Sequence, residues 1–205
     1  MKSERIIKEI LEWGKILLFS LVASIFLSAF ILQPSIVCEA SMEPTLEGKS
    51  SFDVNKAGDY VMIFKSAYIL GNEPEYGDIV IIDSRVNRQR TLKDKVIDNP
   101  LIRRAMNDTN DRQFWIKRVI GEAGDLLEFK EGTVYRNGIA LEEDYIKEDM
   151  MKAFETIKVP ENHVFVMGDN RNISIDSREI GSVPVENVLG KVIFRFYPFN
   201  KISIY

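Results

Sequence analysis

Three short polar segments of the chain contain side chains that could perform catalysis together. In SMEPTL, residues 41–46, Ser41 stands beside a proline turn, nine residues past an uncharged apolar run. In FWIKRVI, residues 114–120, Lys117 interrupts an apolar stretch, and GDNRNISIDSR, residues 168–178, is a polar turn after another apolar stretch. A serine hydroxyl can attack a carbonyl carbon when a nearby uncharged amine removes its proton. These residue types suggest acyl transfer, although each segment alone is common in proteins.

The pattern around Lys117 places its side chain among apolar neighbours. Side chains alternate along a strand, so Lys117 shares one face with Trp115 and Val119, and Arg118 shares the other face with Ile116. A free lysine has a pKa of about 10.4, so only ~0.1% of it is the neutral base at pH 7.5. Burial lowers that pKa and increases the neutral fraction. The alternative is an edge lysine whose ammonium reaches water.

The third segment contains a serine and two opposite charges at alternate positions. If its later part is extended, Ser174, Asp176 and Arg178 lie on one face. Asp176 and Arg178 could then form an ion pair that holds the segment presenting Ser174. The alternative reading of this segment is a polar surface loop.

Histidine and cysteine are scarce in this chain, which contains only His163 and Cys38. One residue of each kind excludes an intramolecular disulfide and a zinc site built from Cys and His. His163 is the rival general base, but it alternates with Phe165 and Met167 as a strand residue does. Few carboxylates lie near Ser174, so we expect no metal ion and no cofactor.

Composition bounds the class of protein. The 205 residues include 27 basic and 31 acidic ones, which gives a net charge of −4, and 45% are hydrophobic. This hydrophobic content supports a packed core and excludes wholesale disorder. A net negative charge is not typical of proteins that bind nucleic acid, which need a basic surface, so we expect no nucleic-acid partner. The length allows one domain with a small appendage.

An apolar segment near the amino terminus predicts a transmembrane helix. Residues 16–32 are 17 consecutive uncharged residues, and counting from Trp13 gives 20, which at ~1.5 Å each span a bilayer core. The basic residues of segment 1–15 favour a cytoplasmic amino terminus. We therefore expect a cytoplasmic tail at 1–15, a transmembrane helix at 16–32 and an extracytoplasmic domain at 33–205. A cleaved signal peptide ending at Ala40 is the alternative.

The remainder of the chain reads as a mostly β domain. Short runs rich in β-branched and aromatic residues are bounded by Gly and Pro, as strands are. The pair Asn137-Gly138, flanked by alternating apolar residues, predicts a hairpin turn. The runs cover residues 76–83, 114–129, 132–141, 163–170 and 190–199.

Residues 84–111 form a charged insertion in this domain. They include seven Lys or Arg and four Asp but no aromatic residue. A short helix is expected near residues 100–106. The insertion is read either as a solvated flap or as a contact with anionic lipid headgroups.

The three polar segments occur in this order behind a single anchor, and together they resemble the type I signal peptidases, membrane-bound serine proteases with a Ser–Lys dyad. With the anchor and the YRNG hairpin, the matching pieces cover well over a third of the chain. The resemblance implies a mostly β catalytic domain that rests on the outer face of the membrane. The pieces are SMEPTL (41–46), YGDIVIID (76–83), KRVIGEAGD (117–125) and GDNRNISIDSR (168–178).

The resemblance also implies a role for each site residue. Ser41 would be the nucleophile, Lys117 the general base and Ser174 a hydroxyl that orients the lysine amine. Asp176 and Arg178 would form a supporting ion pair. The substrate pockets would be shaped by Val37, Met42, Leu46 and Ile116.

One residue departs from the family pattern. Glu39 stands two residues before Ser41, where family members use Ser or Gly near the oxyanion hole. A carboxylate there would oppose a developing negative charge. We therefore assign only the Ser41 backbone N–H to the oxyanion hole and expect Glu39 to point away.

The function implied by the resemblance is that of a membrane-anchored serine endopeptidase that cleaves signal peptides from secretory preproteins after small residues. Its partners would be these preproteins and membrane lipids, and the chain would act as a monomer. One alternative is a noncatalytic membrane-bound assembly or binding factor that keeps the peptidase fold. Another is a self-cleaving regulator with the same chemistry, against which the anchor and the lack of an amino-terminal DNA-binding helix pair argue.

Overall fold

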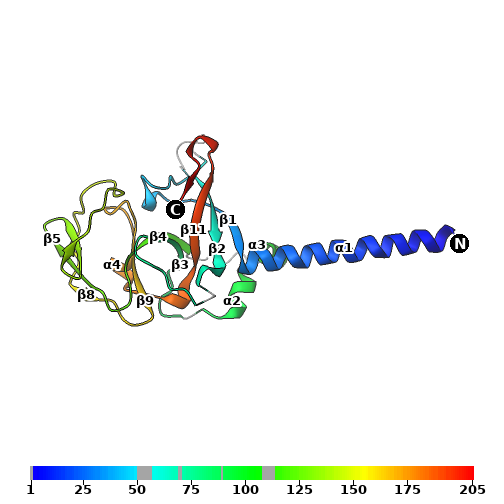
Figure 1. The fold of residues 1–205 in the computed structure, drawn as a ribbon, viewed down its shortest axis with the longest axis horizontal. Helices are drawn as coiled ribbons and strands as arrows, with labels where there is room; N and C mark the ends of the chain where they lie inside the picture. Colours follow the sequence, from blue (N-terminus) through cyan, green and yellow to red (C-terminus); the bar gives the residue numbers. More distant parts are fainter. Residues whose placement is uncertain (1, 50–56, 69–70, 89, 108–113) are drawn as a thin grey trace.

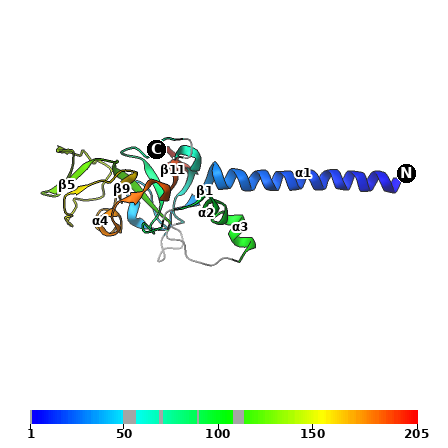
Figure 2. The same ribbon diagram turned by 90° about the horizontal axis from the view of Figure 1, so that it is seen from below.

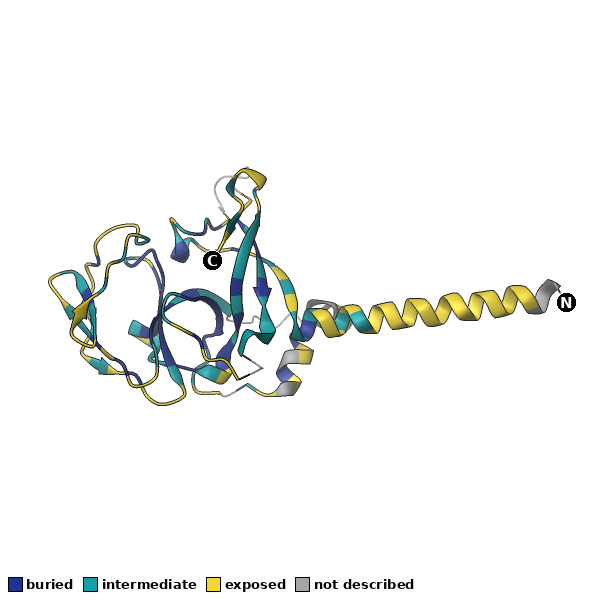
Figure 3. Ribbon diagram, in the orientation of Figure 1, coloured by how far each residue is buried: buried dark blue, intermediate teal, exposed yellow. Residues whose placement is uncertain are grey.

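A long helix is attached to a β domain in the computed structural model (Figure 1). Helix α1 (Lys2–Phe30) projects away from the domain, and all of its residues from 5 to 22 are exposed (Figure 3). This helix is long and apolar enough to cross a membrane. The structure describes residues 2–49, 57–68, 71–88, 90–107 and 114–205.

Helix α1 ends two residues before the predicted end of the transmembrane segment at residue 32. Leu32 already begins strand β1 (Leu32–Ile36), which pairs with β2 (Tyr60–Phe64). Pro34 lacks a backbone N–H and disfavours helical backbone at Gln33, so the helix cannot continue through this sequence.

The junction between α1 and the β domain is bonded to the residues that follow β2. Ser66 Oγ donates to the Phe30 carbonyl over 2.6 Å, and the Lys65 N–H donates to the Ile31 carbonyl over 2.8 Å. Carbonyls at the end of a helix need partners from outside the helix, and these two have them. Only Ile31 separates α1 from β1, so the helix joins the domain without a linker.

The β domain contains two antiparallel sheets, which confirms the predicted mostly β fold. The larger sheet has the strand order β1-β2-β11-β3-β4-β9-β10, with β12 paired to β11. The smaller sheet, β7-β6-β5-β8, lies at the end of the domain away from α1 (Figure 1). The remaining strands are β3 (Ile79–Asp83), β4 (Phe114–Gly121), β5 (Leu126–Lys130), β6 (Thr133–Arg136), β7 (Ile139–Ala140), β8 (Ile157–Lys158), β9 (His163–Met167), β10 (Val183–Pro184), β11 (Val188–Tyr197) and β12 (Ser203–Ile204). Short helices connect them: η1 (Ala40–Met42), η2 (Lys65–Tyr68), α4 (Ser177–Ile180), η3 (Val185–Asn187) and η4 (Phe199–Lys201).

The five predicted runs all contain strands, and the predicted hairpin is present between β6 and β7. Arg136 pairs with Ile139 across the turn. Asn137 (φ 55°) and Gly138 (φ 80°) both have left-handed backbone. Asn tolerates this conformation and Gly adopts it without steric cost, which is why the pair closes a two-residue turn.

Strand β3 lies inside the core, with all five of its residues buried. Ile79 and Ile81 enter one hydrophobic cluster, and Val80 and Ile82 enter another. Both faces of the strand are therefore covered, which explains its continuous apolar sequence. In the neighbouring strand β4, Lys117 lies opposite Val80 of β3, and the pairing of β4 with β9 begins at the next residue, Arg118.

The charged insertion contains two short helices, α2 (Leu92–Ile97) and α3 (Pro100–Ala105), of which only the second was predicted. Thr91 and Asp94 form a capping box at the start of α2, where the Thr91 N–H donates to the Asp94 carboxylate over 2.8 Å. That spacing is the signal from which α2 could have been predicted. Both helices lie beside the domain end of α1 (Figure 2). Residues 89 and 108–111 of the insertion lie outside the described part of the chain.

Candidate active site

The structure brings Ser41 and Lys117 together although they are 76 positions apart in the chain. Ser41 lies on the short helix η1, and Lys117 lies in the middle of strand β4. Lys117 Nζ donates to Ser41 Oγ over 2.8 Å. Ser41 is 8% exposed and Lys117 is 1% exposed, so the pair is screened from bulk water. A hydroxyl and an amine at this distance can exchange a proton directly.

The surroundings of Lys117 favour its uncharged form. Its Nζ lies 5.6 Å from the centre of the Trp115 ring, on the face that strand alternation predicted. Burial lowers the pKa of Lys117 to about 8, since the ammonium loses its hydration. The carboxylates of Asp176 and Glu39 act in the opposite direction, and the Arg178 guanidinium adds to the lowering. Loss of hydration outweighs both carboxylates.

The turn that carries Ser41 is held by Asn170. The Asn170 N–H donates to the Ser41 carbonyl over 3.0 Å, and its side-chain Nδ2 donates to the Ala40 carbonyl over 3.2 Å. Gly168 lies against the same carbonyl, because a Cβ at this position would be 2.4 Å from Ser41 O and 2.3 Å from Ser174 Oγ. Gly168 and Asn170 both belong to the third polar segment, and no function was predicted for either from the sequence.

Ser174 lies beside the dyad in the interior of the protein. It is 5% exposed and contacts the site through Gly168. Within the described residues, no hydrogen bond joins its hydroxyl to Lys117. The structure therefore brings Ser174 to the site without showing the contact to the amine that the resemblance implied.

Asp176 and Arg178 form a buried ion pair. Arg178 Nε donates to Asp176 Oδ1 and Arg178 Nη2 to Oδ2, each over 2.8 Å, and the two side chains are 1% and 0% exposed. Asp176 Oδ2 also accepts the Gly168 N–H over 3.0 Å. Burial by itself raises the pKa of the Asp176 carboxyl, but the bonds from Arg178 lower it below its ordinary value. The pair forms across the start of helix α4, where Asp176 is the N-cap, rather than along an extended segment.

A second buried ion pair, which sequence reasoning missed, ties three segments of the site together. Arg118 donates to both oxygens of Asp169 over 2.8 and 2.7 Å. Thr45 Oγ1 donates to the same carboxylate over 2.5 Å, and the Arg118 guanidinium lies 4.0 Å from the centre of the Tyr145 ring. The serine loop, strand β4 and the turn after β9 are thus joined by charged hydrogen bonds, which are stronger than neutral ones. The available signal was that Thr45, Arg118 and Asp169 each belong to one of the three polar segments.

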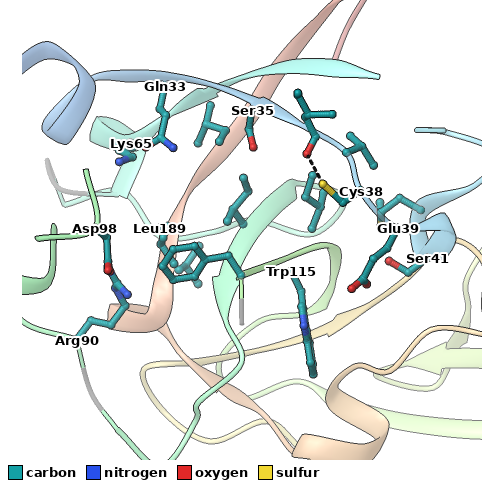
Figure 4. Close-up of a pocket in the computed structure, with 18 of the residues that line it drawn as sticks. Gln33, Ser35, Cys38, Glu39, Ser41, Lys65, Arg90, Asp98, Trp115 and Leu189 are labelled. Carbon is teal, nitrogen blue, oxygen red and sulfur yellow. Dashed lines mark hydrogen bonds and ion pairs between the residues drawn. The ribbon is translucent and has the colours of Figure 1, made fainter. Parts of the chain in front are cut away.

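A pocket opens beside Ser41 (Figure 4). Of the residues assigned to substrate pockets, Val37, Met42 and Ile116 line it. Leu46 is fully buried in the hydrophobic cluster that contains Val37 and Met42, and it is not part of the pocket wall.

The expectation that Glu39 points away from the site was wrong. Its side chain lines the pocket, and its carboxylate lies beside Ser41 (Figure 4). Favourable electrostatics with Lys117 explain this orientation, because a carboxylate near the amine stabilises the ammonium form. The site therefore holds a negative charge near the position of the nucleophile.

The rival base His163 lies elsewhere. It begins strand β9, and its Nδ1 is 2.8 Å from the Glu161 carbonyl. It lines a second pocket together with Glu73 and Glu122, away from the pocket of Ser41. The structure therefore places Lys117, and not His163, within reach of the serine hydroxyl.

A sequence model of the family described as signal peptidase, peptidase S26, matches residues 10–197. The chain belongs to this family. The match includes Ser41, Lys117 and the whole third polar segment, and it confirms the resemblance drawn from the short motifs.

Individual relatives agree with this family assignment. Probable signal peptidase I-2 of Synechocystis is 33% identical over 95% of this chain and 76% of its own length. Signal peptidase I S of Bacillus subtilis is 31% identical over 98% of each chain. Thylakoidal processing peptidase 1 of Arabidopsis thaliana is 33% identical over 94% of this chain, which corresponds to 50% of its own length. A crystal structure of a signal peptidase I from Enterococcus faecalis is 29% identical over 59% of this chain and 97% of its own, with a TM-score of 0.42.

Proposed function

We propose that this chain is a membrane-anchored serine endopeptidase that removes signal peptides from secretory preproteins. The observation that carries the proposal is the buried contact of 2.8 Å between Lys117 Nζ and Ser41 Oγ. Membership of the signal peptidase family and the apolar helix α1 support the same function. In this proposal Ser41 is the nucleophile and Lys117 is the general base.

The proposed reaction proceeds in two steps through an ester. Ser41 Oγ attacks the carbonyl carbon of the scissile peptide while neutral Lys117 takes the hydroxyl proton. The Ser41 backbone N–H stabilises the oxyanion, and the Lys117 ammonium then gives its proton to the departing amine. Lys117, neutral again, takes a proton from water, which attacks the ester. When the ester breaks, Lys117 returns that proton to Ser41 Oγ.

The lowered pKa of Lys117 makes this base available near neutral pH. With a pKa of about 8, about one side chain in ten is neutral at pH 7, against about one in 3,000 for an ordinary lysine with a pKa of 10.5. The Arg178 guanidinium adds to the lowering of the Lys117 pKa and offsets part of the opposite effect of its partner Asp176. Ser174 is proposed to bond the amine once substrate is bound.

Substrate selection is proposed to depend on the pocket beside Ser41. Val37, Met42 and Ile116 form apolar walls there, which suits small side chains one and three positions before the cleaved bond. Leu46 supports these walls from the core. A shallow apolar wall rejects bulky side chains by overlap, so alanine-sized residues fit best.

The anchor and orientation are proposed from helix α1. The basic residues of segment 1–15 favour a cytoplasmic amino terminus, which would place the domain from residue 33 on the extracytoplasmic side. There it would meet preproteins that emerge beside the same membrane, at a high effective concentration. Since one chain supplies both Ser41 and Lys117, we propose that it acts as a monomer, in contact with membrane lipids and without nucleic acid.

The test is cleavage of a purified preprotein by the detergent-solubilised chain, followed by mass spectrometry of both products. Ser41→Ala and Lys117→Met should each abolish cleavage while the circular dichroism spectrum is unchanged. Lys158→Met, at an exposed position in β8, is the matched control and should cleave as the parent does. Full cleavage by either dyad variant would refute the assigned roles, and no cleavage by the parent chain would favour the noncatalytic assembly factor.

A further inference from the structure

The charged insertion contacts one side of the domain end of α1. Residues 5–22 of the helix are exposed, whereas Ala29 is 1% exposed and Ile25 is half-buried. Asn99, which is fully buried between α2 and α3, donates from Nδ2 to the Ile25 carbonyl over 3.4 Å. Figure 2 shows α3 beside the domain end of α1.

This contact places the insertion at the depth of a membrane surface. Ile25 lies five residues before the end of α1, which at ~1.5 Å per residue is about 8 Å along the helix axis. It also lies inside the uncharged part of α1, residues 16–30, whose length of about 22 Å approaches the thickness of a bilayer core. A segment beside Ile25 would therefore lie in the interfacial region of the leaflet nearest the domain.

The outward side chains of the insertion suit that region. Val96, Ile97 and Met106 are 38%, 37% and 62% exposed, although all three are apolar. Lys93 and Arg104 are exposed, and within the described residues no ion pair is found for either. Segments that combine apolar side chains with cations bind at the headgroup and acyl boundary, where the cations meet lipid phosphates.

Three arginines at the start of the insertion are paired within the protein. Arg85, Arg88 and Arg90 each form an ion pair with an aspartate of the same region, at 2.5 to 2.8 Å. Their charge is therefore neutralised within the protein. Among the described side chains of the insertion, Lys93 and Arg104, on the helices beside α1, remain available to an external anionic partner.

We propose that residues 92–107 form a second membrane contact, in which α2 and α3 rest in the lipid interface beside the anchor. The partner is the phospholipid bilayer, with Val96, Ile97 and Met106 at the acyl boundary and Lys93 and Arg104 at the phosphates. This inference rests on the proposed function in one respect, because α1 must span a membrane. Continuity with the exposed apolar surface of α1 favours lipid over a protein partner.

The contact has a consequence for the active site. Arg90 and Asp98, which are bonded at 2.5 Å, line the same pocket as Ser41 (Figure 4). The insertion thus connects the pocket wall to the lipid-facing helices. Lipid contact at α2 and α3 would hold the pocket in one orientation relative to the bilayer.

Depth-dependent fluorescence quenching tests the proposal directly. The full-length protein first receives Cys38→Ser, which removes the native thiol, and then one new cysteine. This cysteine is labelled with a small fluorophore. The labelled protein is reconstituted into vesicles whose lipids have brominated acyl chains, which quench the fluorophore. The positions are Met106→Cys in the insertion, Leu18→Cys in α1 and Ile139→Cys in β7, all of them more than half exposed. We expect quenching of at least twofold at positions 18 and 106 and none at 139.

The outcomes separate this inference from the proposed anchor. Quenching at 18 but not at 106 overturns the lipid contact and leaves the anchor intact, and a cross-link between two copies at 106 would then identify a second chain as the occupant. Absence of quenching at 18 overturns the anchor and the lipid contact together.

The role of Lys93 and Arg104 in binding lipid phosphates is tested by a separate measurement. Lys93→Gln with Arg104→Gln should reduce quenching at position 106 in vesicles with a third of anionic lipid, and should leave it unchanged in neutral vesicles. An equal effect in both kinds of vesicle would contradict a role for the two cations at lipid phosphates. Both residues are exposed, so the substitutions should leave the fold intact.

Discussion

Asn170 holds the backbone of Ser41 in place, because its N–H donates to the Ser41 carbonyl over 3.0 Å. Its side chain adds a bond of 3.2 Å to the Ala40 carbonyl, so two successive carbonyls of the serine turn have the same partner residue. The first bond is available to any residue except proline, whereas the second requires a side-chain donor of this length. The position of the nucleophile therefore depends on a residue that does not take part in the reaction itself.

Replacing Asn170 by Ala should slow the reaction without loss of the fold. The loss of one neutral hydrogen bond costs about 1 kcal/mol of unfolding free energy, and a small displacement of Ser41 lowers kcat by about tenfold. KM should change little, since the pocket walls are untouched. Asn172→Ala is the control, because Asn172 donates to the Asp149 carbonyl at an exposed site. Equal loss of kcat in both variants would contradict a positioning role.

Gly168→Ala should be more damaging than Asn170→Ala. The new Cβ would overlap the Ser41 carbonyl oxygen, which belongs to the backbone and cannot rotate away. Insertion of a methyl group into a packed site costs about 1 to 3 kcal/mol, and relief of the overlap would displace Ser41 or Ser174. Steady-state kinetics and urea unfolding should both report the change. In Gly14→Ala the added Cβ meets nothing within 4 Å, so this variant should match the parent chain.

The pH dependence of cleavage should follow the titration of Lys117. The amine acts as a base only when it is neutral, so kcat/KM should rise about tenfold per pH unit below its pKa of about 8 and level off above it. A profile measured with a short precursor peptide between pH 5.5 and 10 checks this. A rate that is constant from pH 6 to pH 9 would mean that a different group controls the reaction.

Glu39→Gln should shift this profile to lower pH. The Glu39 carboxylate raises the pKa of Lys117 by stabilising its ammonium form, so removing the charge favours the neutral base. The variant should be faster than the parent at pH 6.5 and similar to it at pH 9.5. Glu155→Gln, at an exposed position before β8, should leave the profile unchanged. A shift of the profile to higher pH would contradict the assigned effect of Glu39.

Arg178→Met should destabilise the fold strongly. It would leave the Asp176 carboxylate buried without its partner, which costs about 3 to 5 kcal/mol. Asp176 has a lowered pKa in the folded state, so the stability it contributes is present above its ordinary pKa and is lost as pH falls through the folded value. Urea unfolding of the parent chain should give a lower unfolding free energy at pH 3 than at pH 7. The difference between the two pH values should be smaller in the variant. Lys152→Met, which removes a solvent-exposed ion pair, should cost less than about 1 kcal/mol.

Local patterns in the sequence predicted the parts of the fold that depend on local interactions. The alternation around Lys117 placed it on the face of Trp115, and Asn137-Gly138 closed the expected turn, because period and backbone preference act within a few residues. The orientation of Glu39 depends on the charge of Lys117, which is far away in the chain, and so the prediction for it was wrong.

Long-range packing accounts for the other differences. The bond network of Arg118 and Asp169 joins segments 51 residues apart, and sequence spacing alone gives no measure of such a contact. The family resemblance assigned Leu46 to a substrate pocket, but this side chain packs in the hydrophobic cluster that contains Ile79 and Ile81 of β3. These positions are decided by which strands become neighbours in the sheet.

The direct passage from α1 into β1 at Ile31 has a mechanical consequence. The absence of a linker and two hydrogen bonds across the joint oppose rotation of the domain relative to α1. With α1 in a membrane as proposed, Ser41 would stay at a constant height above the bilayer. A constant height would set the number of residues between the apolar segment of a preprotein and the bond that Ser41 can reach. Cleavage sites would then be chosen by their distance from the membrane as well as by the size of their side chains.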